Sequence, residues 1–113
     1  MNVAFFKNWT NQARKGFVEL SILNDIHNRR MYGYEIERKF RKSFGLLLSE
    51  GTIYNILRRF KRNGLVEITQ TKSPDGPKRK YYCLTDSGRE TLSQMNIIWQ
   101  SIRRQADSIE HGK

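Results

Sequence analysis

Residues 49–65 limit the possible fold most, because they carry a complete helix signal with two unlike faces. Ser49 is a good N-cap residue, since its hydroxyl can accept a hydrogen bond from a backbone N–H of the first turn. Gly64 stands where a left-handed C-cap would end the helix. At about 100° per residue, four apolar side chains fall on one face: Ile53, Ile56, Leu57 and Phe60. The segment therefore predicts an amphipathic helix.

The opposite face of this predicted helix is basic. Asn55, Arg58 and Arg62 lie roughly opposite the apolar side chains, and they are flanked by Thr52, Arg59 and Lys61. A solvated surface face is the plain alternative. However, no acid follows Glu50 within the segment to pair with these cations. The pattern favours DNA recognition, in which cations contact phosphates and base edges.

The charge of the whole chain supports a polyanionic partner. The 113 residues have a formal net charge of +10, and 37% of them are hydrophobic, which is low for a self-contained core. Residues 1–84 hold 17 Lys and Arg against 7 Asp and Glu, so residues 85–113 are neutral. A strongly basic domain suits DNA, RNA or an anionic membrane surface. The neutral residues 85–113 are expected to have a role other than polyanion binding. A shared dimer core would stabilise so small a domain.

Several other classes of protein are disfavoured. Cys83 is the single cysteine, so an internal disulfide is impossible and a reducing, cytoplasmic location is expected. No apolar run approaches about 18 residues, and the N-terminus lacks a signal-peptide core. His27 has no partner at ligand spacing, and no carboxylate pair accompanies a histidine. We therefore predict no enzyme, no metal site and no cofactor.

Two helices are predicted before residue 28. Residues 1–13 place Phe5, Phe6, Trp9 and Ala13 at the spacing of a short amphipathic helix. These aromatics are expected to dock on the domain or on a partner subunit. A membrane-surface helix is the alternative, although Lys7 is the only charged side chain of this segment. Residues 17–26 are apolar almost all round the helical wheel, which predicts a central helix.

The basic helix has a close helical neighbour. Residues 28–31 are predicted to form a loop, and Gly33 then opens a helix over Tyr34–Phe44 with a buried stripe of Ile36, Phe40 and Phe44. The apolar residues 46–48 leave only a short connection to Ser49. A helix, a short connection and a basic helix make a helix-turn-helix.

A hairpin follows the basic helix. Residues 66–71 alternate with a period of two, residues 73–77 are rich in turn formers, and residues 81–84 predict a second strand. The tip is basic, and its cations are Lys72, Lys78, Arg79 and Lys80. A solubilising loop is the alternative, but contiguous cations beside a turn suit contact with phosphates or the minor groove.

The final helix is predicted to begin at Thr85 and Asp86, which suit its cap and first turn. It carries apolar residues at alternating spacings of three and four: Leu92, Met95, Trp99, Ile102, Ala106 and Ile109. This heptad pattern is typical of a helix that packs on another long helix, so we predict dimerisation. Ile97 and Ile98 widen the stripe and suit contact with the domain body.

These elements together predict a mainly α fold with a β-hairpin wing. Residues 1–84 would form a winged helix-turn-helix domain, and residues 85–113 a C-terminal dimerisation helix. A two-fold dimer presents two equivalent basic helices. Such dimers bind inverted repeats whose half-sites lie about 34–36 Å apart.

The chain also resembles a known family in four boxes that occur in register. They are Tyr-Gly-Tyr-Glu-Ile at 32–36, Leu-Ser-Glu-Gly-Thr-Ile-Tyr at 48–54, Leu-Arg-Arg-Phe at 57–60 with Asn-Gly-Leu-Val at 63–66, and Gly-Pro-Lys-Arg-Lys-Tyr-Tyr at 76–82 with Leu84, Thr85 and Gly88. On these boxes the chain, from about Lys15 to Ile109, is similar to the PadR family of bacterial transcriptional regulators, in its short subclass with one C-terminal helix.

The resemblance implies a homodimeric repressor of a neighbouring gene, often one for an efflux pump or a detoxification enzyme. It implies that the wing cations contact the DNA backbone and that the DNA surface includes Tyr34, Ser49, Thr52, Tyr54 and Arg58. It also implies that Trp99 could stack on a planar aromatic ligand at the dimer centre. The chain departs from the family pattern at Tyr32, where histidine is common, and at Phe60 and Lys61, where Leu-Glu is usual.

Two questions stay open from the sequence. Tyr81 and Tyr82 among basic residues could stack on single strands, so a sequence-independent nucleic-acid or RNA-binding protein is the alternative function. Trp99 could equally serve ordinary dimer packing.

Overall fold

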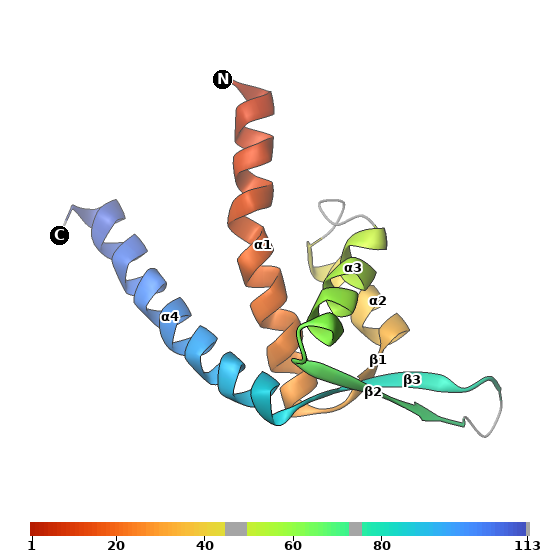
Figure 1. Cartoon of the computed structure of the whole chain (residues 1–113). Helices are drawn as coiled ribbons and strands as arrows, with labels where there is room; N and C mark the ends of the chain where they lie inside the picture. Colours follow the sequence, from red (N-terminus) through yellow and green to blue (C-terminus); the bar gives the residue numbers. More distant parts are fainter. Residues whose placement is uncertain (45–49, 73–75, 113) are drawn as a thin grey trace.

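The computed structural model describes residues 1–44, 50–72 and 76–112. Its elements in chain order are α1 (Val3–Asn28), β1 (Met31–Tyr32), α2 (Gly33–Phe44), α3 (Glu50–Arg62), β2 (Val66–Thr71), β3 (Arg79–Leu84) and α4 (Asp86–His111). The lower half of α1 lies beside α2 and α3, the hairpin extends to one side, and α4 diverges from α1 (Figure 1). The fold is the predicted winged helix-turn-helix with a C-terminal helix.

The first helix is longer than predicted. A separate short helix over residues 1–13 is wrong, because α1 runs without a break from Val3 to Asn28. The side chain of Asn2 caps it by accepting a hydrogen bond from the N–H of Phe5 at 3.0 Å. Gly16 in the middle of the helix weakens it by only about 1 kcal/mol, and no proline interrupts the segment. A polar stretch between two apolar segments therefore does not end the helix.

The core lies between the second half of α1, α2, α3 and the sheet. Its most deeply buried side chains come from three helices: Val18, Ile22, Leu23, Ile36, Ile53 and Leu57. The apolar face predicted for α3 is confirmed, because Ile53, Ile56, Leu57 and Phe60 are all buried. The helix ends at Arg62, and Gly64 just beyond it has the predicted left-handed conformation, with a φ of 74°. Phe44 is predicted to be buried and Ser49 to cap the basic helix. The side chain of Phe44 and all of Ser49 lie outside the described part of the chain.

The sheet contains one strand more than predicted. It is antiparallel with the order β1-β3-β2, and Val66 pairs with Leu84 while Met31 pairs with Tyr82. The prediction of a loop through Met31 is therefore wrong. A two-residue strand is too short to show a period of two, and its partner lies about fifty residues away in the chain. The short β1 fixes the start of α2 against the base of the wing.

The first turns of α4 belong to the domain. Thr85 caps the helix, as predicted, by accepting a hydrogen bond from the N–H of Gly88 at 2.9 Å. Leu92 is only 2% exposed and packs in the core of its own chain. This differs from the predicted dimerisation stripe, in which Leu92 was the first member. Asn24 of α1 and Asn96 of α4 exchange two side-chain hydrogen bonds of 3.0 and 3.1 Å, which join the two helices.

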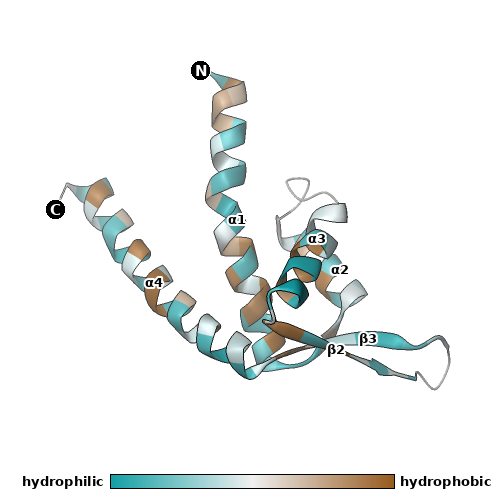
Figure 2. Ribbon diagram, viewed as in Figure 1, coloured by the Kyte–Doolittle hydropathy of each residue, from teal (hydrophilic) through white to brown (hydrophobic). Residues whose placement is uncertain are grey.

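Beyond this junction, apolar side chains are open to solvent on both helices. Phe5, Phe6 and Trp9 are more than half exposed on α1, and Ile109 near the end of α4 is 81% exposed. Figure 2 shows brown, apolar segments along the diverging parts of both helices. Ile97 and Ile98, which were predicted to suit contact with the domain body, are 56% and 58% exposed. In the described ranges, no helix is long and apolar enough to cross a membrane.

Candidate nucleic-acid interface

The outer face of α3 is polar and accessible. Asn55, Arg58 and Arg62 are exposed, whereas the neighbouring Ile56 and Leu57 are buried. The guanidinium of Arg58 donates a hydrogen bond to Oδ1 of Asn55, one turn earlier. Both side chains therefore point away from the core, and the packing of α3 on α2 holds them in a fixed place.

Arg59 differs from its neighbours because it has an acidic partner. Its guanidinium forms an ion pair with Glu19 of α1, and both side chains are partly buried. The sequence alone does not reveal this pair, because Glu19 lies forty residues before Arg59 and outside the basic segment. Arg59 thus joins α3 to α1, while Arg58 and Arg62 remain exposed.

A cationic hollow lies where α3 passes α1. Its volume is about 420 Å³, and its lining includes four predicted DNA-contacting residues, Thr52, Asn55, Arg58 and Arg62. The other lining residues are Lys15, Ile56 and Arg59. Lys15 comes from α1 and was not predicted as a contact. We refer to this hollow as the α1–α3 cleft.

A second hollow lies between the wing and the start of α2, with a volume of about 470 Å³. It brings together five more predicted contacts, Tyr34, Tyr54, Lys78, Arg79 and Lys80. Tyr32, Gly33 and Tyr82 complete its lining. Gly33 fits closely there, because a Cβ at this position would lie 3.4 Å from the Tyr54 ring and 3.6 Å from the Tyr82 ring. We refer to this hollow as the wing hollow.

All five tyrosines of the chain meet at or beside the wing hollow, and arginines lie over three of their rings. The guanidinium of Arg79 lies 4.6 Å from the centre of the Tyr32 ring, and Arg30 lies 4.6 Å from that of Tyr81. Arg38 lies 5.8 Å from the Tyr34 ring. A guanidinium stacked on a ring is held in place while its N–H groups stay free for phosphate oxygens.

The rings also pack on one another. The centre of the Tyr32 ring lies 6.5 Å from that of Tyr34 and 5.7 Å from that of Tyr81. Burial raises the pKa of the Tyr82 phenol above its ordinary value; nearby Tyr54 adds to the rise and Arg58 opposes it. Tyr82 is therefore neutral near pH 7 and brings no negative charge to this cationic surface.

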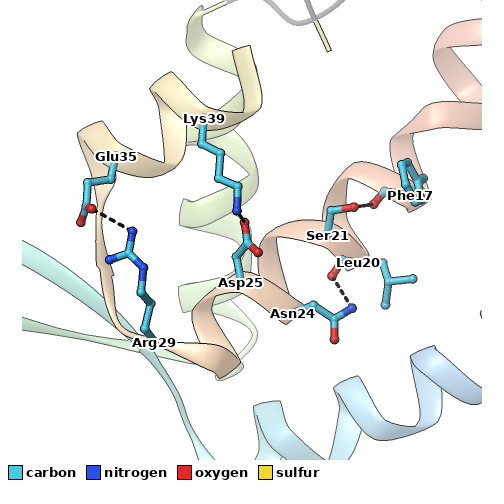
Figure 3. Close-up of polar contacts among 8 residues, drawn as sticks. All are labelled: Phe17, Leu20, Ser21, Asn24, Asp25, Arg29, Glu35 and Lys39. Atoms are coloured by element: carbon cyan, nitrogen blue, oxygen red, sulfur yellow. Dashed lines mark hydrogen bonds and ion pairs between the residues drawn. The ribbon is translucent and has the colours of Figure 1, made fainter. Parts of the chain in front are cut away.

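Ion pairs fix the start of α2 relative to α1. Glu35 accepts a hydrogen bond from the backbone N–H of Tyr32 and pairs with Arg29, each at 3.1 Å. Lys39 pairs with Asp25 of α1 at 2.5 Å (Figure 3). The nearby turns of α1 use Ser21 and Asn24 to hydrogen-bond their own backbone. These contacts hold Tyr32 and Tyr34 in register with the wing.

A third, apolar groove lies on the other side of α1. It has a volume of about 520 Å³ between α1 and α4, and its lining includes Gly16, Phe17, Met95 and Trp99. The rings of Phe17 and Trp99 lie 5.2 Å apart. Trp99 is thus half-buried within its own chain and faces this groove, which we call the α1–α4 groove.

The described residues offer no metal site, since no three His, Cys, Asp or Glu side chains gather within them. Cys83 is a partly buried free thiol in β3. The described surface groups cations, phenols and amides instead, which suits polyanion recognition.

Known proteins share this architecture. A PadR-like transcriptional regulator from Bacillus cereus is 37% identical, with a TM-score of 0.80, and the match covers 90% of this chain and 99% of that one. A Streptococcus transcriptional regulator is 32% identical, with a TM-score of 0.78 and coverage of 88% and 97%. An uncharacterised protein of Lysinibacillus sphaericus is 29% identical over 87% of this chain and 92% of its own length.

The family model agrees with these likenesses. The model of the transcriptional regulator PadR-like family matches residues 22–94, which extend from the last two turns of α1 to the first turns of α4. The match includes both helices of the helix-turn-helix and the whole wing. The family consists of DNA-binding transcriptional regulators and not of enzymes. The chain belongs to the PadR-like family of transcriptional regulators.

Proposed function

We propose that the protein is a homodimeric repressor that binds an inverted-repeat operator with α3 in the major groove. The observation that carries this proposal is the orientation of α3. Its apolar face is buried in the core, while Asn55, Arg58 and Arg62 project from the opposite face. A helix held in this way can present amide and guanidinium groups to base edges.

The remaining predicted contacts suit the DNA backbone. Lys78, Arg79 and Lys80 lie at the wing, where cations can reach flanking phosphates or the minor groove. Tyr34, Thr52 and Tyr54 line the two cationic hollows and can donate hydroxyl hydrogen bonds to phosphates. Ser49 is assigned by resemblance to the family alone.

The exposed apolar surfaces support a homodimer. α1 and α4 extend beyond the domain with Phe5, Trp9, Ile102 and Ile109 open to solvent. Side chains of this kind are normally covered by a partner when they are contiguous. Met95, Trp99, Ile102, Ala106 and Ile109 keep the role proposed from their spacing, with Met95 and Trp99 also packing on their own chain.

A planar aromatic ligand is the proposed signal that releases the DNA. The α1–α4 groove is large enough for a ligand of several rings and is lined mainly by apolar side chains. Trp99 offers a ring face beside Phe17. Titration with planar cationic dyes should quench tryptophan fluorescence, and the quenching should be lost in Trp99→Ala, where Trp9 still reports background. Dyes that quench both proteins equally would contradict this site.

Selection of binding sites from random duplex DNA tests the central proposal. The expected product is an inverted repeat with half-sites about 10–10.5 base pairs apart, centre to centre. Competition between duplex and single strands tests the alternative of sequence-independent binding. Selection without a consensus, or preference for single strands, would overturn the operator model. Transcription from a promoter that contains the selected site should fall when the protein is added.

A further inference from the structure

The α1–α3 cleft has a cation that does not belong to the helix-turn-helix. Lys15 lies on α1, thirty-seven residues before the first α3 residue of the cleft, Thr52, and it lines the cleft together with Arg62. Nothing in the local sequence around Lys15 marks it as a binding residue, since Arg14 beside it is equally basic. Only the fold shows that Lys15 lies on the face of α1 that looks towards α3.

The geometry of α1 fixes the direction in which Lys15 points. Residues four apart on a helix share a face, so Lys15 lies one turn before Glu19. Glu19 is directed towards α3, because it forms the ion pair with Arg59. Lys15 is therefore held on the face of α1 that looks towards α3, in agreement with its place in the cleft lining.

The cleft has more positive than negative charge. Four cations line it, and Glu19 neutralises Arg59 alone. Within the described residues, Lys15, Arg58 and Arg62 form no ion pair, and each is exposed. Exposed cations that share a cleft repel one another weakly through the solvent. An anion in the cleft would relieve that repulsion.

We propose that the cleft binds backbone phosphates of the operator and that Lys15 contributes one of the contacts. This inference rests on the proposed placement of α3 in the major groove. The strand that borders the groove then passes along the side of α3 that carries Arg62 and faces α1. The DNA footprint consequently extends from the wing, across α3, to the middle of α1.

The experiment compares Lys15→Gln with Lys7→Gln, which removes the same charge from α1 two turns away from the cleft. The dissociation constant for the selected duplex is measured over a series of salt concentrations. Each phosphate contact contributes about 0.9 to the slope of log K against log salt. Lys15→Gln should lower the slope by about 0.9 and weaken binding, by a similar factor for selected and scrambled duplexes. Lys15→Arg should restore the slope, and Lys7→Gln should leave it unchanged.

The outcomes separate this inference from the proposed function. If the wild-type protein selects an operator but Lys15→Gln retains the full slope, the phosphate contact is wrong and the operator model stands. An equal loss of slope in Lys7→Gln would mean that net charge, and not the cleft, is responsible, and would also overturn the inference. If the wild-type protein does not bind duplex DNA, both proposals fail together. Thermal unfolding of each variant checks that the fold is unchanged.

Discussion

Arg58 and Arg59 are adjacent in α3 but have different roles, because their side chains are buried to different extents. Arg58 is exposed and donates a hydrogen bond to Asn55 on its own helix, whereas Arg59 is partly buried against Glu19 of α1. In the sequence the two arginines are equivalent. The helical rotation of about 100° between them places one towards solvent and the other towards α1. Their replacement should therefore affect different properties.

Arg58→Ala should weaken binding to the selected operator by about 1–3 kcal/mol, a factor of roughly 5 to 150, and relax specificity at one base position. The melting temperature should stay within a few degrees of the wild-type value, because the side chain is exposed. Arg59→Ala should instead lower stability, since it leaves Glu19 partly buried without its partner. Unchanged affinity in Arg58→Ala would show that the base-reading face of α3 is misplaced.

Tyr32 is expected to position Arg79 for the DNA backbone. Its ring contacts the Arg79 guanidinium and the rings of Tyr34 and Tyr81. Tyr32→Leu should weaken operator binding by roughly two- to fivefold, since an exposed cation–π contact contributes about 0.5–1 kcal/mol. Tyr32→Phe retains the ring and is the matched control. Equal losses in both variants would indicate a role for the hydroxyl rather than for the ring.

At the scale of elements, the sequence predicts what depends on local signals. The C-terminal end of α3 follows from Gly64, and the start of α4 follows from Thr85. β1 escapes prediction because two residues show no period and its pairing with β3 is long-range. The wing hollow was likewise predicted only in part. Tyr34 and Arg79 were predicted to contact DNA, whereas Tyr32 was not, and it joins them through tertiary packing.

Gly88 shows why α4 begins where it does. A Cβ at this position would lie 2.0 Å from the carbonyl oxygen of Leu65, which accepts a hydrogen bond from the N–H of Thr85. Because the obstacle is backbone, no side-chain rotation can relieve it. Gly88→Ala should lower the free energy of unfolding by at least about 2 kcal/mol, as measured by urea denaturation.

Gly51→Ala is the matched control for Gly88→Ala. It lies in the first turn of α3, and a Cβ there would meet nothing within 4 Å. Its stability should be unchanged or raised by at most about 1 kcal/mol, because alanine favours the helix. If Gly88→Ala proves as stable as Gly51→Ala, α4 is not docked as tightly on Leu65 as the structure indicates.

At the scale of the whole molecule, the chain is more extended than a domain of its length. Its radius of gyration is 16.4 Å, against about 13 Å expected for a compact chain of this size. The excess comes from the diverging ends of α1 and α4 (Figure 1), which leave apolar side chains uncovered. The same turns of α1 line the α1–α3 cleft through Lys15 and the α1–α4 groove through Phe17. A partner subunit or ligand that moves α1 would therefore act on both surfaces.

Ile102→Asn combined with Ile109→Asn tests the dimer that this shape implies. Ile102 is 47% exposed and Ile109 81% exposed, so neither contributes to the core of the single chain and the domain should still fold. The loss of apolar contact between subunits should shift the mass measured by sedimentation from dimer to monomer. Binding to the inverted repeat should fall at least tenfold, while binding to an isolated half-site changes little, because the α3 surface is intact.

Gln105→Asn provides the control for this pair, since it alters an exposed polar side chain on the same part of α4. It should leave both the mass and the operator affinity at wild-type values. A wild-type protein that sediments as a monomer would refute the dimer directly. A double variant that keeps the dimeric mass would place the subunit contact elsewhere, with Phe5 and Trp9 of α1 as the next exposed apolar side chains to replace. Circular dichroism of every variant confirms that a lost dimer is not a lost fold.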